Sequence, residues 1–513
     1  MKAATCRFTS ILIGLTLYGC TTDAVITRRS QMSDPLETGD LIILMKDGTR
    51  YDLNNYRLTD SLLVGAGFQG VAGTAFRGEL KLKEISHICS RNSSFFKSLV
   101  AIGVVAGFVG LSASYLDRRS GLQVNEVDGY YSPYRGGGTM SCPFIYSWDG
   151  TKYRFQSETF AGAVFKGAER ASFDILDGLR PVEGIYKLRI TNERPEIEYT
   201  NEMRLFAIDC VQGANVLTDA RGGMHTVSNP LLPEKCSDFQ GRDVTDKIAM
   251  ADGVFWESDL TDKDFTHKED LKDGLILDFK KPAGLMWAKL VVRGINTNLG
   301  GFAFAQLFGL RGPNFLELYK QLETDTSMGK RMLSFMKREG MLHVSVWKGD
   351  RWVELGALPD VGPLISKEQL VLLNVGDIGG EVIKIKLESS TDLWRLDRVA
   401  IDFSKDLPLS VQEAPLVSAL DESGQSVAGQ LRVDDDQYYV TTPGQFADLS
   451  FGEIPPAKGM SRTFIVKARG YYHIWASPGK TDRGDIVERI LREPLYGSMR
   501  YMPAWKEARG RRM

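Results

Sequence analysis

Three observations predict a mainly β protein. The 513-residue chain contains 52 glycines, many of them in Asp-Gly and Gly-Asp pairs of the kind that close tight turns. Between these turns apolar and polar residues alternate, as in Tyr186, Leu188 and Ile190, which is typical of strands with one buried face. Helical spacing interrupts this rhythm over residues 301–338. We therefore expect a small N-terminal β-barrel or roll, an apolar Gly-rich helix, and then β-sandwich-type domains with a helical insertion.

The charge balance limits the classes of partner. The chain has 63 Lys and Arg against 65 Asp and Glu, so no net field attracts it to nucleic acid, and we expect no nucleic-acid partner. An apolar content of 43% is that of a folded globular protein. Partners must then be recognised by local patches.

The first residues read as a targeting signal rather than as part of the fold. Lys2 and Arg7 precede a short apolar run over residues 8–17, and residues 1–19 are predicted to be a signal peptide. The sequence LYGC, which ends at Cys20, resembles a bacterial lipobox. This resemblance implies cleavage before Cys20 and acylation of its thiol, which anchors the chain in the bacterial envelope at the outer membrane or the periplasmic face of the inner membrane. The alternatives are an ordinary cleaved signal or an uncleaved helix.

Four cysteines remain after such processing. Cys89, Cys142, Cys210 and Cys236 are candidates for up to two disulfides in an oxidising periplasm. Four buried thiols are an equal alternative, because no spacing fixes a pairing. None of the four has a CxxC or metal-ligand spacing, so we expect no metal site and no cofactor.

The segment from residue 20 to residue 140 is predicted to hold the large C-terminal part of the chain at a distance from the membrane anchor. Residues 20–38 read as a tether. Residues 39–93 contain four or five short strands with glycine turns, which suits a small β-barrel or roll. Residues 117–140, rich in glycine and charge, read as a linker.

Between the roll and the linker lies an apolar, Gly-rich segment over residues 95–116, predicted to be helical. Residues 98–116 carry no charge and are about long enough to cross a bilayer. Gly103 and Gly107 form a GxxxG pair that would let one helical face pack closely against another helix. Three interpretations stay open: a transmembrane span, an element packed on the membrane surface or in an oligomer, and a buried helix of the soluble fold.

The remaining chain is predicted to be a large β body. The sequence SCPFIYSWDG at residues 141–150 combines an apolar run with an Asp-Gly turn, and so predicts a hairpin. The expected order is a β domain at 141–300, a helical insertion at 301–338, a β-sandwich at 339–478 and a basic tail at 479–513.

A family resemblance rests on this hairpin motif and on two segments that follow it, ETFAGA and LRITNE. Together they resemble a family of uncharacterised bacterial envelope lipoproteins, and a similar SCPF-type segment occurs beside tetratricopeptide or propeller-type repeats. The likeness covers about residues 140–475. It implies no activity, catalytic residue or cofactor.

Two acidic clusters are candidate sites for chemistry. A glycosidase needs two carboxylates at a fixed distance, and Ca²⁺ needs several oxygen ligands. We expect neither, because the glutamates fall where alternate strand positions face solvent and the aspartates suit a charged turn. The clusters are Glu193, Glu196, Glu198 and Glu202, and Asp434, Asp435 and Asp436.

The motifs of serine hydrolases, P-loop NTPases and zinc proteases are absent from the sequence. We therefore expect no catalytic residue and a non-enzymatic scaffold or interaction protein. Its expected partners are the membrane, through the lipid and residues 98–116, and an envelope protein or a second copy of the chain. The alternative is a glycan-binding surface lipoprotein that stacks sugars on Trp347 and Trp352.

Overall fold

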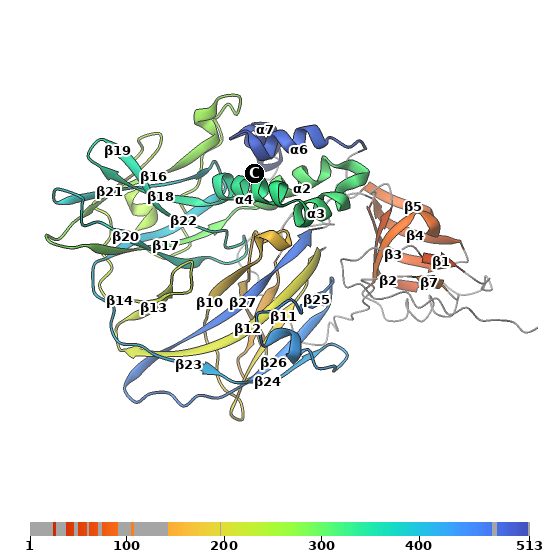
Figure 1. Cartoon of the computed structure of the whole chain (residues 1–513), viewed down its shortest axis with the longest axis horizontal. Coiled ribbons are helices and arrows are strands. Elements are labelled where there is room, and N and C mark those ends of the chain that lie inside the picture. The colour runs from red at the N-terminus through yellow and green to blue at the C-terminus, as the bar shows by residue number, and fades with distance from the viewer. Residues whose placement is uncertain are drawn as a thin grey trace, which may run out of the picture.

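The computed structural model describes residues 24–26, 37–45, 50–58, 61–69, 74–90, 104–106, 142–194, 196–474 and 480–510. The predicted mainly β class is confirmed: residues from 142 onward form two β-sandwiches with helices gathered along one side (Figure 1). A separate sheet precedes them.

The first sandwich packs two sheets around a common core. One sheet has the strand order β24–β26–β11–β8–β9, and the other β10–β27–β12–β23 with β25 also paired to β12. Leu188, Leu205, Leu449 and Val466 meet between the sheets and are fully buried. The strands are β8 Phe144–Trp148, β9 Tyr153–Glu158, β10 Arg170–Leu176, β11 Ile185–Thr191, β12 Glu196–Val211, β23 Ser410–Ala414, β24 Leu416–Asp421, β25 Tyr439–Thr441, β26 Phe446–Gly452 and β27 Met460–Ile474.

The second sandwich is built the same way, from sheets of order β15–β16–β21–β18–β19 and β20–β17–β22. Its core includes Leu277, Leu290, Val344 and Leu387. A hairpin of β13 and β14 packs between the sandwiches, because Val216 contacts the first and Leu217 the second. The strands are β13 Asn215–Thr218, β14 Met224–Val227, β15 Lys235–Asp238, β16 Lys272–Lys280, β17 Trp287–Asn296, β18 Leu342–Lys348, β19 Arg351–Leu358, β20 Lys367–Asn374, β21 Val382–Ser390 and β22 Trp394–Asp402.

The second sandwich is an insertion in the first. All of its strands lie in sequence between β12 and β23, and β12 then pairs with β27 along its whole length. The predicted ranges 141–300 and 339–478 therefore each contribute strands to both sandwiches.

A layer of helices joins the two cores. The predicted helical insertion appears as α2 Leu299–Gly309, α3 Phe315–Thr324 and α4 Thr326–Gly340. Phe302 of α2 is buried in the second core, whereas Leu318 of α3 and Met332 of α4 are buried in the first.

The predicted basic tail at 479–513 is not a tail over its described part. It forms α6 Gly484–Arg492 and α7 Tyr496–Gly510. Ile490 and Leu491 enter the first core and Trp505 enters the second. The apolar face that the sequence shows at Ile486, Ile490 and Leu491 faces the body instead of solvent or lipid. The short helices are α5 Ala428–Leu431, η1 Leu82–Glu84, η2 Lys166–Ala168, η3 Thr245–Ile248, η4 Lys268–Leu271 and η5 Gly312–Asn314.

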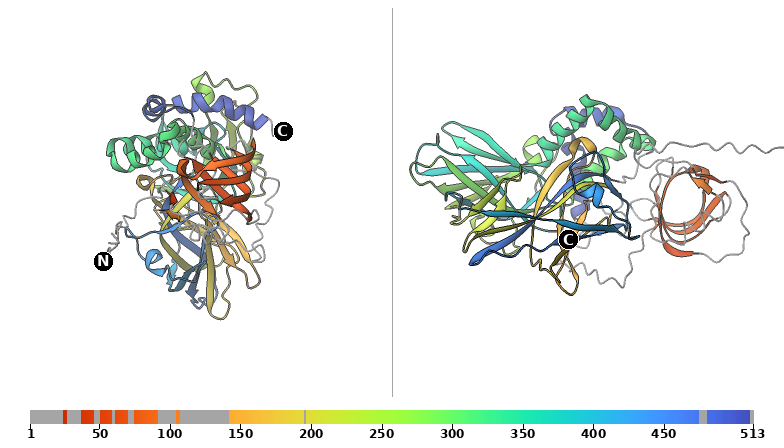
Figure 2. Two further views of the ribbon diagram at one scale, coloured as in Figure 1. Left: turned by 90° about the vertical axis from the view of Figure 1, so that its right-hand side faces the viewer. Right: turned by 60° about the horizontal axis from the view of Figure 1, so that its bottom comes forward.

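The N-terminal sheet has the order β5–β4–β3–β2–β6 and its own core, which includes Ile43, Leu53 and Leu63. It curves strongly (Figure 2), but its end strands β5 and β6 are not paired within the described residues, so it is an open roll rather than a closed barrel. The strands are β2 Glu37–Met45, β3 Arg50–Leu58, β4 Leu62–Gln69, β5 Thr74–Lys81 and β6 Ile85–Ser90.

Most of the predicted anchoring segment lies outside the described residues, including the signal peptide at 1–19, Cys20, Gly103, Gly107 and the linker at 117–140. Of the helix predicted at 95–116, only β7 Val104–Ala106 is described, and it pairs as a strand with β1 Ala24–Ile26. In the part of the chain that the structure describes, no helix is both long and apolar enough to cross a membrane.

Candidate functional site

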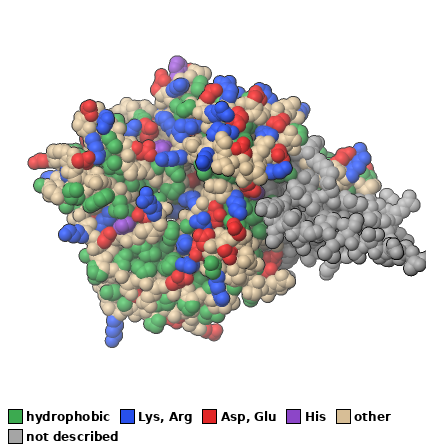
Figure 3. Space-filling model, in the orientation of Figure 1, with side chains coloured by type: hydrophobic (Ala, Val, Ile, Leu, Met, Phe, Trp, Pro, Cys, Tyr) green, Lys and Arg blue, Asp and Glu red, His purple; other side chains and the backbone are tan. Residues whose placement is uncertain are grey.

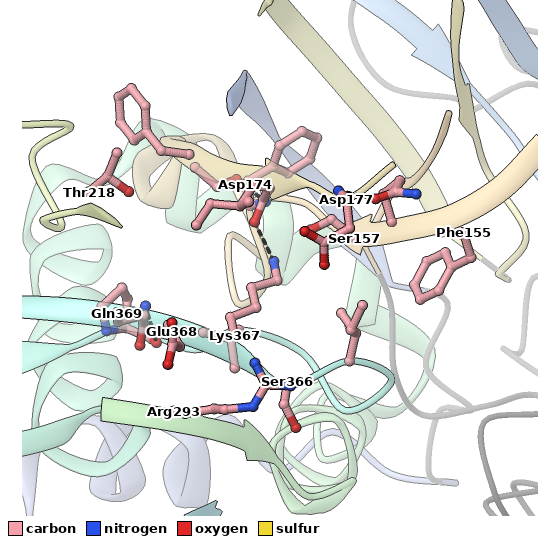
Figure 4. A pocket seen from close by; sticks show the side chains of 18 of the residues that line it. Phe155, Ser157, Asp174, Asp177, Thr218, Arg293, Ser366, Lys367, Glu368 and Gln369 are labelled. Atoms are coloured by element: carbon pink, nitrogen blue, oxygen red, sulfur yellow. Dashed lines mark hydrogen bonds and ion pairs between the residues drawn. The ribbon is translucent and has the colours of Figure 1, made fainter. Parts of the chain in front are cut away.

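A cleft of about 700 Å³ lies between the two sandwiches. One wall consists of the edge strands β9 and β10 of the first sandwich, and the other consists of β20 and the loop at 359–366 that precedes it in the second (Figure 4). The lining mixes polar and apolar residues, and Phe155, Phe173 and Ile365 are among the apolar ones.

One ion pair crosses the cleft. Lys367 of β20 donates from Nζ to Oδ1 of Asp174 on β10, at 2.6 Å, and also to the backbone oxygen of Glu158 (Figure 4). Asp174 is 4% exposed, and its other oxygen, Oδ2, is buried and accepts no hydrogen bond from the residues that the structure describes. The cleft thus holds a buried carboxylate with spare acceptor capacity.

The loop at 359–366 fastens the second sandwich to the first. Glu158, at the end of β9, accepts a hydrogen bond at Oε2 from the backbone nitrogen of Leu364, at 2.7 Å. Arg170 donates from Nη2 to the backbone oxygen of Asp360 at 2.6 Å. Burial raises the pKa of Glu158 to about 7, and burial also raises the pKa of Asp360. The joint therefore contains carboxyl groups that the fold holds away from water.

The charges that line the cleft are nearly balanced. The basic residues are Arg154, Arg170, Arg180, Arg293 and Lys367. The acidic residues are Asp149, Asp174, Asp177, Asp219, Asp360 and Glu368. Acidic and basic side chains are also interspersed over the face of the molecule in Figure 3. The site therefore has no strong field of one sign.

Side-chain hydrogen bonds link the ends of the two strands in the first wall. Gln156 on β9 accepts a hydrogen bond from the backbone nitrogen of Asp177, which follows β10, at 2.8 Å. The hydroxyl of Ser172 on β10 accepts one from the backbone nitrogen of Phe160, which lies after β9, at 2.6 Å. These bonds tie β9 and β10 to each other.

The tryptophans predicted to stack a ligand lie elsewhere. Trp347 and Trp352 face each other across the β18–β19 hairpin, with ring centroids 5.3 Å apart and an interplanar angle of 70°. Trp347 is 36% exposed, and Nζ of Lys386 lies 5.6 Å from the centroid of the Trp352 ring. Neither tryptophan lines the cleft.

The predicted disulfides are not formed among the described cysteines. Cys142, Cys210 and Cys236 are buried free thiols, and each belongs to a different apolar cluster, so they do not meet. The side chain of Cys89 lies outside the described residues. The Sγ of Cys142 lies 3.7 Å from Oε1 of Glu158, and burial raises the pKa of this thiol.

The expectation that the four glutamates face solvent is wrong. Glu196, Glu198 and Glu202 are buried, because other parts of the protein cover both faces of β12, and Glu193 is half-buried. Glu198 accepts a hydrogen bond from Thr441 at 3.0 Å, and burial together with Glu196 raises its pKa. In contrast, Asp434–Asp436 form the expected turn, held by Asn201. The described residues contain no cluster of three His, Cys, Asp or Glu side chains that suits a metal ion.

Sequence reasoning missed the residues that shape the cleft. Glu158 begins the ETFAGA segment, but Asp174 and Lys367 lie in no motif. They come from different sandwiches and are 193 residues apart, so only the pairing of distant strands reveals their contact.

No family model matches the chain, and no curated protein matches it. Among solved structures, a chain from an archaeal virus described by its triple jelly roll fold and turret assembly shares 9% identity; the match covers 67% of this chain and 99% of that one, with a TM-score of 0.15. A chain of the Sulfolobus turreted icosahedral virus shares 9% identity over 66% of this chain and 100% of its own, with a TM-score of 0.13. Likeness at these scores carries no argument.

Proposed function

We propose that this chain is a membrane-anchored bacterial lipoprotein that acts as a non-enzymatic interaction protein of the cell envelope, and that it binds its partner in the cleft between the sandwiches. The observation that carries the proposal is the cleft itself, whose two walls are joined by the Lys367–Asp174 pair and the Glu158–Leu364 hydrogen bond. A preformed site loses little conformational freedom on binding.

The envelope location rests on the sequence. The LYGC segment at Cys20 and the resemblance of residues 140–475 to envelope lipoproteins both support it. Replacement of Cys20 by Ala should abolish incorporation of a labelled fatty acid into the chain. A wild-type chain that incorporates none would contradict the lipid anchor.

The helices support a rigid site. Because Phe302 and Trp505 are buried in the second core while Met332 and Leu491 are buried in the first, the helical layer fixes the relative position of the two walls. Binding in the cleft then needs no closure of one sandwich onto the other.

A photoreactive residue placed in the full-length chain tests the cleft in cells. At Gln369, on the wall of the cleft, it should give a discrete adduct, and a second substitution, Ser366→Trp, should suppress that adduct by filling the space. The matched control position is Val417 on β24, which is 58% exposed and outside the cleft. Equal adducts from both positions, or none from Gln369, would contradict the proposal.

A glycan-binding surface lipoprotein is the second candidate. It is favoured by the exposed ring of Trp347 beside Trp352 and Lys386, since aromatic rings stack on sugar faces. The angle of 70° between the two rings means that one sugar ring can lie flat on only one of them. The double variant Trp347→Ala, Trp352→Ala should abolish glycan binding if this surface is the site.

A further inference from the structure

We infer that the cleft between the sandwiches binds a neutral, polyhydroxylated ligand, a short oligosaccharide. The inference rests on the proposed function, because it names the class of ligand that the same cleft takes. It differs from the second candidate, because it places the sugar in the cleft and not on the Trp347–Trp352 surface.

Several charged side chains in the cleft already have partners within the protein. Lys367 pairs with Asp174, Arg293 pairs with Asp397 at 3.0 Å, and Glu368 pairs with Arg398 at 3.5 Å. Because acidic and basic side chains are interspersed in the lining, a ligand of either sign would meet like charges, and a cationic ligand would also compete with Lys367 for Asp174. A neutral ligand avoids both conflicts, and this selects against charged ligands.

Asp174 supplies the strongest specific contact. Its side chain is 96% buried and lines the cleft, and Oδ2 has no donor among the described residues. A buried acceptor without a donor is unfavourable, and a ligand hydroxyl group that donates to Oδ2 removes that penalty. Because Oδ2 is closed to solvent and Oδ1 is held by Lys367, the carboxylate turns slightly about this ion pair to meet the ligand.

An extended peptide would offer N–H donors too, but peptides are commonly bound by addition to a free strand edge. Here side chains take backbone N–H groups that lie just after the two edge strands. Gln156 takes that of Asp177 after β10, and Ser172 takes that of Phe160 after β9. These bonds limit extension of the edges at the strand ends, whereas the side-chain groups of the lining suit hydroxyl groups, and the peptide control below separates the two ligand classes.

Two phenylalanines provide apolar surfaces for the C–H faces of sugar rings. The ring of Phe155 packs at an angle on the rings of Phe144 and Tyr146, with centroids 5.5 and 5.6 Å away. The ring of Phe173 lies so close to Gly222 that a Cβ there would come within 2.2 Å of it. Both rings are thus held in place, and both line the cleft, whose lining also includes the hydrogen-bonding groups of Thr218, Ser366 and Gln369. Figure 4 shows Phe155 at one end of the cleft, with Thr218 and Gln369 toward the other.

Isothermal titration calorimetry on the full-length chain, in a detergent without a sugar headgroup, tests the inference. The probes are chitotetraose, maltotetraose and cellotetraose, with tetragalacturonate as the anionic control and a capped, uncharged nonapeptide as the peptide control. We expect at least one neutral tetrasaccharide to bind and neither control to bind. Phe155→Ala and Asp174→Ala should each weaken that binding at least about tenfold, or about 1.4 kcal/mol.

Because Asp174→Ala leaves Lys367 without its partner and can unfold the chain, Ser366→Trp serves as the second variant. It fills the cleft without touching the ion pair and should abolish sugar binding at an unchanged melting temperature. The matched control is Trp347→Ala with Trp352→Ala, which should bind as the wild type does.

The remaining outcomes separate two failures. If no neutral sugar binds, or if sugar binding survives Ser366→Trp and is lost in the double tryptophan variant, the inference is overturned. If the nonapeptide binds and Ser366→Trp abolishes that binding, the ligand class is wrong while the cleft remains the binding site. If Ser366→Trp affects no probe and also leaves the cellular adduct at Gln369 unchanged, the proposed function fails as well.

Discussion

Glu158 is one of the residues that join the two sandwiches. It is 1% exposed, it accepts from the backbone of Leu364, and the backbone of Gly362 passes directly over its carboxyl group. A Cβ added to Gly362 would lie 2.4 Å from Oε2 of Glu158, and Gly362 has a φ of +86° that favours glycine. Glycine is therefore required at this position for two separate reasons.

Comparison of two glycines separates these reasons. Gly380 has a φ of +84° but nothing near its added Cβ, so Gly380→Ala should lower the free energy of unfolding only by the conformational strain, about 1 kcal/mol. Gly362→Ala should lower it by about 1–3 kcal/mol more, because the methyl group displaces Glu158. Urea denaturation of both variants measures the difference. Equal losses of unfolding free energy would show that Glu158 can move away from the added methyl group without a cost in stability.

The raised pKa of Glu158 makes the stability of the body depend on pH. The folded-state pKa of about 7 lies above the ordinary value of 4.5, so the folded state binds this proton more tightly than the unfolded state does. The stabilisation that proton binding by Glu158 gives the folded state is fully present below pH 4.5 and is lost as the pH rises to 7. This changes the free energy of unfolding by about 3 kcal/mol.

Glu158→Gln should therefore reduce the rise in unfolding free energy between pH 7.5 and pH 5. The glutamine keeps an oxygen acceptor for Leu364 but cannot ionise. Glu234→Gln, at an exposed position, is the control and should leave the pH profile as it is in the wild type. An unchanged profile for Glu158→Gln would mean that Glu158 titrates as an exposed carboxyl group does.

At the scale of elements, the C-terminal helices act as part of both cores. Trp505 of α7 is 2% exposed, and its indole nitrogen donates to Oδ2 of Asp392 at 2.7 Å, while Arg509 pairs with the same carboxylate. Asp392 has a positive φ of 61° in the turn before β22. The helix therefore covers a strained turn as well as an apolar surface.

Trp505→Ala should lower the free energy of unfolding by about 3–5 kcal/mol, because it removes a large buried side chain and leaves a cavity. Arg500→Ala, at an exposed position of the same helix, should change it by less than about 0.5 kcal/mol. Chemical denaturation followed by tryptophan-independent far-UV circular dichroism measures both. A loss below about 1 kcal/mol for Trp505→Ala would show that α7 is not part of the core.

Elements with strong local patterns could be predicted from the sequence. Tyr186, Leu188 and Ile190 alternate and are the buried residues of β11, and the helical spacing over 301–338 appears as α2 to α4. The burial of Glu196 and Glu198 could not be predicted, since charged residues at alternate positions indicate a solvent-facing side unless it is known that both faces of the strand are covered. The burial of residues 480–510 could not be predicted either, because the sequence does not show which surface their apolar face packs against.

At the scale of the whole molecule, the arrangement depends on strands that pair over long sequence distances, and no local sequence pattern reveals these pairings. Tyr186 pairs with Phe451, and Leu205 pairs with Val466. In each pair the two residues are separated in the sequence by the whole second sandwich. Asp174 and Lys367 meet only because this topology brings β10 and β20 to the same cleft. Sequence reasoning recognised sandwich-type strands but could not assign them to two nested bodies.

The nested topology and the shared helices should make the body unfold as one unit. Leu205→Ala in the first core and Leu387→Ala in the second remove fully buried side chains and should each lower stability by about 2–5 kcal/mol. In differential scanning calorimetry both variants should shift the same main transition. Two separable transitions, each moved by only one of the variants, would contradict this coupling.

The insertion of one sandwich inside the other also fixes an order of events during synthesis. When β12 leaves the ribosome its partner β27 has not been made, whereas every strand of the second sandwich is complete before β23 appears. The second sandwich can therefore fold first, on a chain whose earlier strands still expose one edge and one apolar face. Of these earlier strands, β8, β9 and β11 can pair with one another, but β10 and β12 lack their strand partners until the chain through β27 has been made, so they are the strands that most need a chaperone.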